Sequence, residues 1–211
     1  MAGSRVVWPG LLAFAGAGLW LLLAGPADVL GIDSGNAGMV LLMTATWTAL
    51  YQVGRLPPED VVRVGSPAEW KAWIGTAFMA AAIAYFLTRG EVLAGVTVFN
   101  DPHAQRIGRN LVLLLVAWSV LSSVMASRWK GVVEQDERDR EIAAQASGWG
   151  RGALVAVVIG LAVLLGLSPA SRLAWASHLM IANLLIFALM WSCFVEYAAT
   201  AAYYWRERRW Q

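Results

Sequence analysis

The chain of 211 residues is poor in charge and in the side chains that bind metals or form disulfides. Charged residues make up 14% of it, whereas soluble domains carry about 25%. There is one cysteine, Cys193, and there are two histidines. A lone cysteine excludes an intrachain disulfide and leaves the redox compartment open. The low charge excludes most soluble classes and points to the bilayer.

The sequence also lacks the patterns of catalysis. It has no nucleophile motif, no phosphate-binding loop and no pair of acids within an apolar stretch. Neither histidine lies deep in an apolar stretch, so a b-type haem between helices is not expected. The net charge of +2 is too small for a nucleic-acid footprint. We therefore expect a protein that is not an enzyme, with no cofactor and no nucleic-acid partner.

Long apolar stretches dominate what is present, since hydrophobic residues make up 59% of the chain. A membrane span needs roughly 17 to 25 mostly apolar residues. Two of the six apolar stretches, Trp73–Leu87 and Leu111–Met125, are short for a span, so we expect their helices to extend into the flanking residues. The sequence predicts an all-α polytopic membrane bundle, residues 1–211 forming one domain, with spans at Val6–Ala24, Ala37–Val53, Trp73–Leu87, Leu111–Met125, Gly152–Leu167 and Met180–Tyr203.

Basic residues are distributed unequally between the loops. Segments on the side of both termini hold twelve Lys and Arg, and the opposite loops hold four. Because basic residues concentrate on the cytoplasmic side, this bias predicts that both termini lie in the cytoplasm. Trp149 and most other tryptophans fall near predicted span ends, where indole rings anchor at the interface. Gly152, Ala156 and Gly160 recur every four residues and predict a helix-packing face.

The most polar run is "DERDREI", in which six consecutive charges occupy Asp136–Glu141. With its flanks it predicts an exposed cytoplasmic helix over about 133–147, and Gly148 and Gly150 are expected to break this helix before the next span. Two acid-before-base pairs, Glu134 with Arg138 and Asp136 with Arg140, are each worth about 0.2–0.5 kcal/mol. The run is either a solvated connector or a docking site for a protein partner, formed by Asp136, Glu137, Arg138, Asp139, Arg140 and Glu141.

Other clusters predict weaker sites. The acids of the run could offer oxygens to a hard cation, but its two arginines compete for them, so no metal is expected there. On the outer side, Asp101, His103 and His178 could bind zinc or sense pH. Their loose spacing favours ordinary surface residues.

Two polar residues fall at membrane depth. Glu196 lies roughly 15 Å deeper than Arg206 along the last span, at about 1.5 Å per residue. An acid there is either a structural partner of another helix or a functional group. Asn183, in the same span, is expected to bridge helices through its amide.

The segments "DERDREIAAQAS" and "ANLLIFALMWSCFVEYAATAAYYWRERR" resemble the prokaryotic integral-membrane family filed as domain of unknown function 2178, over roughly residues 111–209. Asp136, Glu137, Arg138 and Asp139 match the family's loop signature, and Glu196, Tyr203 and Tyr204 match its tail signature. The sequence departs from the family at "SGWGR", where Arg-Ile-Tyr-like residues are usual. The resemblance implies a membrane protein without an established activity, whose genes are often found beside those of small cytoplasmic helix-turn-helix regulators.

These observations favour a small inner-membrane protein that acts through a cytoplasmic partner docked on the charged loop. The alternative is a small transporter or ion channel, formed by a homo-oligomer, in which Glu196 carries the ion or proton. The lipid bilayer is a partner in both hypotheses.

Overall fold

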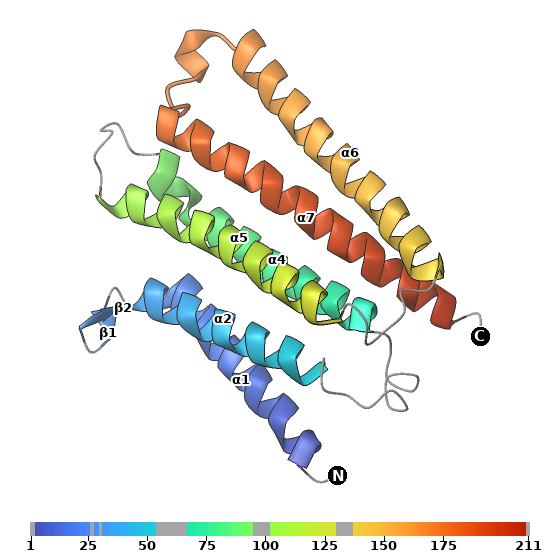
Figure 1. The fold of residues 1–211 in the computed structure, drawn as a ribbon. Coiled ribbons are helices and arrows are strands. Elements are labelled where there is room, and N and C mark those ends of the chain that lie inside the picture. The colour runs from blue at the N-terminus through green and yellow to red at the C-terminus, as the bar shows by residue number, and fades with distance from the viewer. Residues whose placement is uncertain are drawn as a thin grey trace. The chain divides into compact units, whose positions relative to one another are not determined.

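The computed structural model describes residues 3–25, 28–29, 31–53, 67–94, 102–129 and 137–209. The described chain is almost wholly helical (Figure 1), which confirms the predicted all-α class. Its elements are α1 (Gly3–Ala24), β1 (Asp28–Val29), β2 (Ile32–Asp33), α2 (Ser34–Val53), α4 (Pro67–Ala94), α5 (Pro102–Trp129), α6 (Glu137–Leu167), the 3-10 helix η1 (Ala170–Arg172) and α7 (His178–Arg208).

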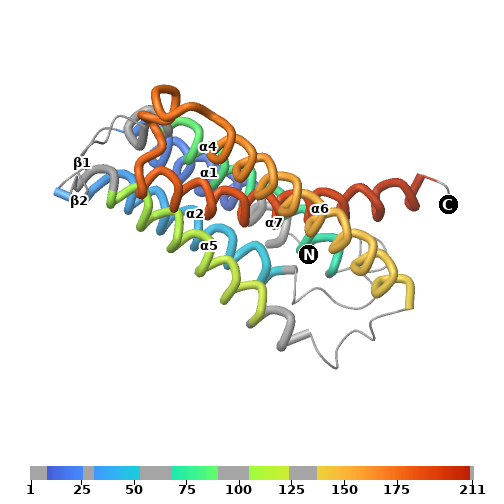
Figure 2. Tube along the Cα trace, turned by 90° about the horizontal axis from the view of Figure 1, so that it is seen from above, coloured from blue at the N-terminus to red at the C-terminus, as the bar shows by residue number. Residues whose placement is uncertain are grey.

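The chain forms two compact units, one from Met1–Ile74 with Val116–Gln135 and one from Gly75–Leu115 with Asp136–Gln211. In the first unit α1 and α2 pack side by side (Figure 1, Figure 2). Their connection contains a short antiparallel pair, β1 with β2, and turns at Gly31, whose φ of 79° favours glycine. Gly18 and Gly38 are buried where the two helices meet, next to Leu22 and Leu42.

The second unit combines α6 and α7 with the C-terminal part of α4 and the N-terminal part of α5. Phe86 of α4 stacks on Phe187 of α7, with ring centroids 4.9 Å apart. On α5, Ile107, Leu111 and Leu114 are buried at helical spacing. These apolar contacts form the core of the unit.

Four described helices are long and apolar enough to cross a membrane, over Ala68–Arg89, Gln105–Ser123, Glu137–Leu167 and His178–Arg208. A shorter apolar helix covers Pro9–Ala24. Both α4 and α5 have 28 residues, so the two short stretches do extend into their flanks. The length and composition of these helices fit a membrane-embedded protein.

One expectation about local structure was wrong. The charged segment and the span that follows form a single helix of 31 residues, α6, without a break at Gly148 or Gly150. An interior glycine costs about 1 kcal/mol relative to alanine, which packing of the helix against a neighbour can offset. Gly150 is in such a contact, against α7.

Candidate functional site

The residues of interest gather where α6 begins and α7 ends, and we call this region the polar end of the hairpin (residues 137–150 and 196–209). Here α6 buries Ile142, Ala146 and Gly150, one residue every four, against α7. Beyond this point no residue of α6 is buried, and many of its apolar side chains are exposed, such as Val155 at 54% and Ile159 at 57%. Figure 1 shows the two helices separating toward η1. The hairpin is therefore closest at its charged end.

Two interactions join the charged start of α6 to the last turns of α7. The guanidinium of Arg138 donates to Oε2 of Glu207 through both Nε, at 2.6 Å, and Nη2. The buried Tyr204 donates its hydroxyl to Oδ1 of Asp139 at 2.7 Å. Because 65 and 69 residues separate these partners, the contacts hold the first turn of α6 on α7.

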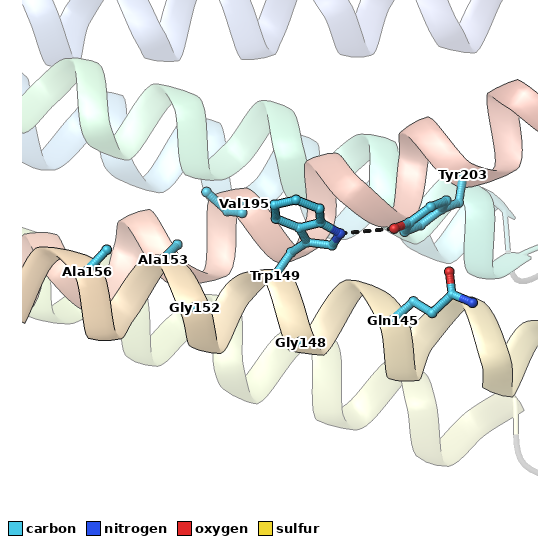
Figure 3. A pocket seen from close by; sticks show the side chains of 8 residues that line it. All are labelled: Gln145, Gly148, Trp149, Gly152, Ala153, Ala156, Val195 and Tyr203. Atoms are coloured by element: carbon cyan, nitrogen blue, oxygen red, sulfur yellow. Dashed lines mark hydrogen bonds between the residues drawn. The ribbon is translucent and has the colours of Figure 1, made fainter.

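A third interaction crosses the hairpin further along. The indole Nε1 of Trp149 donates to the hydroxyl of Tyr203 at 2.9 Å (Figure 3). Beside this pair lies an open groove of about 660 Å³. Its walls come from both helices and are lined by Gln145, Gly148, Trp149, Gly152, Ala153, Ala156, Val195 and Tyr203.

Glu196 packs on α6 at Gly150. A methyl group at Gly150 would lie 3.0 Å from Cβ and 3.1 Å from Oε2 of Glu196. Next to it, the hydroxyl of Ser192 donates to the carbonyl oxygen of Gly150 at 2.8 Å. Glu196 is half-buried, and no ion pair to its carboxylate is found among the described residues. Glycine at position 150 thus makes room for this acid.

Asn183 lies in a separate polar contact of the same unit. It is 1% exposed, and its Nδ2 donates to the carbonyl oxygen of Leu179 on its own helix at 2.8 Å. Its side chain also lies against Gly108 of α5. Asn110, also 1% exposed, donates to the hydroxyl of Tyr85 at 3.3 Å. Within the described part of the chain, the Oδ1 atoms of both asparagines have no hydrogen-bond partner.

The predicted docking residues divide into two groups. Arg138 and Asp139 contact α7, whereas Glu137, Arg140 and Glu141 are exposed. Glu141 accepts a hydrogen bond from Gln145 at 3.3 Å. Asp136 and Glu134 lie outside the described residues, so the two pairs expected within this helix remain predictions.

The predicted outer-side cluster is described only in part, so it remains a prediction. Asp101 lies outside the described residues, and His103 lies in the first turn of α5. His178 is exposed at the start of α7, after Ser177, whose side chain caps the helix by accepting from the backbone N–H of Met180 at 3.1 Å. In the ranges that the structure describes, no group of three or more His, Cys, Asp or Glu side chains could hold a metal ion.

The sequence identified most of these residues but not the residues that they contact. Glu207 is not among the predicted site residues, and Gly150 was expected to break the helix. The available signal was spacing, because Ile142, Ala146 and Gly150 lie one turn apart and mark the packed face of α6. This face predicts a continuous helix with a close contact at the glycine.

Comparison with protein-family models, with curated proteins and with solved structures gives no match for this chain.

Proposed function

We propose that this is a small multi-pass membrane protein that acts without catalysis, through a protein partner docked on the charged first turns of α6. The observation that carries this proposal is the division of the charged run. Arg138 and Asp139 are held by Glu207 and Tyr204 of α7. The charges beside them are left exposed.

The exposed charges share one side of the helix. Glu137, Arg140 and Glu141 lie at relative positions i, i+3 and i+4, which places them on one face. We call them the presented face. A solvated connector needs no fixed orientation, whereas a docking site gains affinity when its contact residues are held in place before binding. The contacts to α7 supply such an orientation.

The proposal retains the resemblance to the family filed as domain of unknown function 2178. Glu137, Arg138 and Asp139 of its loop signature lie on α6 and its tail signature lies on α7, the two helices that the Asp139–Tyr204 hydrogen bond joins. A cytoplasmic regulator is the kind of partner that the resemblance implies.

The test is site-specific photocrosslinking in intact cells that express the full chain. A photoreactive residue at Ala144, exposed one turn after Arg140, should give a discrete protein adduct. Reversing the presented face (Glu137→Lys, Arg140→Glu and Glu141→Lys together) should abolish the adduct, while Arg138 and Asp139 stay unchanged.

The matched control is Arg172→Glu, which reverses an exposed charge on η1. The control should leave the adduct intact. An adduct that survives the triple reversal, or none from the wild type, would show that the charged segment is only a connector.

We further propose six spans, with α1 and α2 crossing in addition to the four longer apolar helices, and both termini in the cytoplasm of a prokaryotic cell. The bias of basic residues supports this orientation. Reporter fusions after Lys71, Lys130 and Trp210 should report cytoplasm, and fusions after Asp101 and Ser171 the outer side. An outer-side signal at Lys130 would contradict the arrangement.

The second candidate is a small oligomeric transporter or channel that uses Glu196. The observation that favours it is the half-buried carboxylate against Gly150, in a helix apolar enough to span a membrane. Glu196→Gln preserves size and removes titration. A relay predicts that this variant abolishes pH-dependent flux in liposomes without a change in thermal unfolding, whereas flux that survives the substitution leaves Glu196 as a packing residue.

A further inference from the structure

The last turns of α7 carry basic and aromatic side chains that point away from α6. Trp205, Arg206 and Arg209 are all exposed, with Trp205 at 49%. Their spacing of three and four residues places them on one face of the helix. We call these three residues the basic face of α7. They lie at the end of a helix that is long and apolar enough to cross a membrane, where such a helix meets the headgroup layer.

The acids of α7 lie on the other side of this helix. It has two, Glu196 and Glu207, and both contact α6. Glu207 and Tyr204 mark the side of α7 that is bonded to α6. At 3.6 residues per turn, the centre of the basic face lies about half a turn away from that side. An anion that approaches the basic face therefore meets arginine on α7 and no acid of this helix.

Aromatic rings hold both guanidinium groups of the basic face. The guanidinium carbon of Arg209 lies 3.9 Å from the centroid of the Trp205 ring. That of Arg206 lies 5.3 Å from the centroid of the Tyr203 ring, whose hydroxyl is bonded to Trp149. Within the described residues neither arginine is in an ion pair. Because a guanidinium that lies on a ring keeps its N–H edge for a bidentate bond to phosphate, both arginines are placed to bind an anion.

From this arrangement we propose that the basic face of α7 binds the phosphate groups of anionic phospholipids in the adjacent membrane leaflet. Basic residues beside a spanning helix attract anionic lipids, and each contributes a factor of about five in affinity. Tryptophan favours the headgroup level of a bilayer, which suits the exposed ring of Trp205. One turn deeper the same face continues with Ala202, which is exposed and apolar. The proposal rests on the membrane location of α7 but not on the docked protein partner.

The experiment places a photoreactive residue at Ala202 of the full chain. The protein is reconstituted in liposomes with equal amounts of phosphatidylglycerol and of phosphatidylcholine with identical acyl chains, and mass spectrometry of the adducts identifies the headgroup beside the basic face. Two arginines predict about a 30-fold excess of the phosphatidylglycerol adduct. The double variant Arg206→Gln with Arg209→Gln should bring the two adducts to near equality.

Two controls separate this site from net charge and from membrane location. The double variant Arg140→Gln with Arg172→Gln removes the same charge from exposed arginines of α6 and η1, and it should retain the excess. A photoreactive residue at Ile159, 57% exposed on the apolar part of α6, should give adducts of both lipids in equal amounts. The absence of any lipid adduct at Ile159 would refute the membrane location and the proposal with it.

Other outcomes overturn the lipid preference alone. Lipid adducts at Ile159 together with equal adducts of the two lipids at Ala202 would leave the membrane location intact and refute the basic face as a binding site. An excess that survives the loss of Arg206 and Arg209, or that is lost to the same extent in the control pair, has the same consequence. A protein adduct at Ala202 in place of lipid would show that another chain covers this face, which also overturns the proposal.

Discussion

The α1–α2 hairpin and the α6–α7 hairpin both bring two helices together, but glycine has opposite roles in them. In the first hairpin, a methyl group at Gly38 would lie 2.6 Å from the carbonyl oxygen of Gly18 and from the amide nitrogen of Leu22. In α6, a methyl group at Gly148, Gly152 or Gly160 would meet nothing within 4 Å. Glycine therefore allows close backbone packing between α1 and α2, whereas in the other hairpin it leaves part of the surface of α6 open.

The difference shows how each hairpin is held. Backbones in α1 and α2 approach closely, as small residues allow in membrane helices. The polar end of α6–α7 is held by side chains, through Arg138 with Glu207, Tyr204 with Asp139 and Trp149 with Tyr203. Among the α6 glycines, only Gly150 closely approaches the backbone of the partner helix, at the carbonyl oxygen of Ser192. Side-chain contacts leave an interface that substitution can adjust, whereas backbone contacts tolerate no added atom.

The largest effect is expected from Gly38→Leu. The three atoms nearest to the new Cβ are all backbone atoms of α1, which cannot move aside, so overpacking should lower the free energy of unfolding by about 3 kcal/mol. Denaturation by sodium dodecyl sulphate in mixed micelles measures this loss. Gly16→Leu is the control because its position on α1 is open, and equal losses at both positions would refute the backbone contact.

A smaller loss is expected from Tyr204→Phe in the other hairpin. The substitution removes the hydrogen bond to the Asp139 carboxylate, and a bond to a charged group is worth about 1.5–3 kcal/mol. The same denaturation assay should show a loss of about 2 kcal/mol, within the range for that bond. Asp139→Asn, which keeps an acceptor, should lose less. Wild-type stability in Tyr204→Phe would mean that this contact does not hold the start of α6.

Gly150→Ala and Gly160→Ala compare a contacting glycine with an open one on the same helix. Alanine in a helix interior is favoured over glycine by about 1 kcal/mol. At Gly160 the gain should appear in full, whereas at Gly150 the methyl group would crowd Glu196 and the carbonyl oxygen of Ser192. The two variants should therefore differ by about 1 kcal/mol in unfolding free energy, and the same gain in both would show that Gly150 has free space.

Much of the fold could be predicted from the sequence because apolar length and helix signals act locally. The apolar stretches Trp73–Leu87 and Leu111–Met125 predict helices that extend into their flanks, and they lie within α4 and α5, of 28 residues each. The prediction that failed locally was at Gly150, where packing against α7 outweighs the low helix propensity of glycine.

The candidate site could be predicted only in part. Composition and charge singled out Asp136–Glu141 and Glu196, but pairing depends on how α6 and α7 align along their length. That alignment brings Asp139 to Tyr204 over 65 residues of separation, and no local pattern encodes it. Tyr203 and Tyr204 entered the prediction only through a resemblance, without a partner for either.

The smallest expected effect concerns the Arg138–Glu207 ion pair. Its side chains are 46% and 35% exposed, and water screens such pairs, which contribute about 0.2–1 kcal/mol. A double-mutant cycle with Arg138→Ala and Glu207→Ala should give a coupling energy of about 0.5 kcal/mol. The coupling should shrink further in 1 M salt, where the screening length falls to about 3 Å. A coupling energy above about 2 kcal/mol that resists salt would place this pair among buried interactions. The small value expected here leaves the orientation of the exposed charges mainly to the Tyr204–Asp139 hydrogen bond and to the packing of Ile142 and Ala146 on α7.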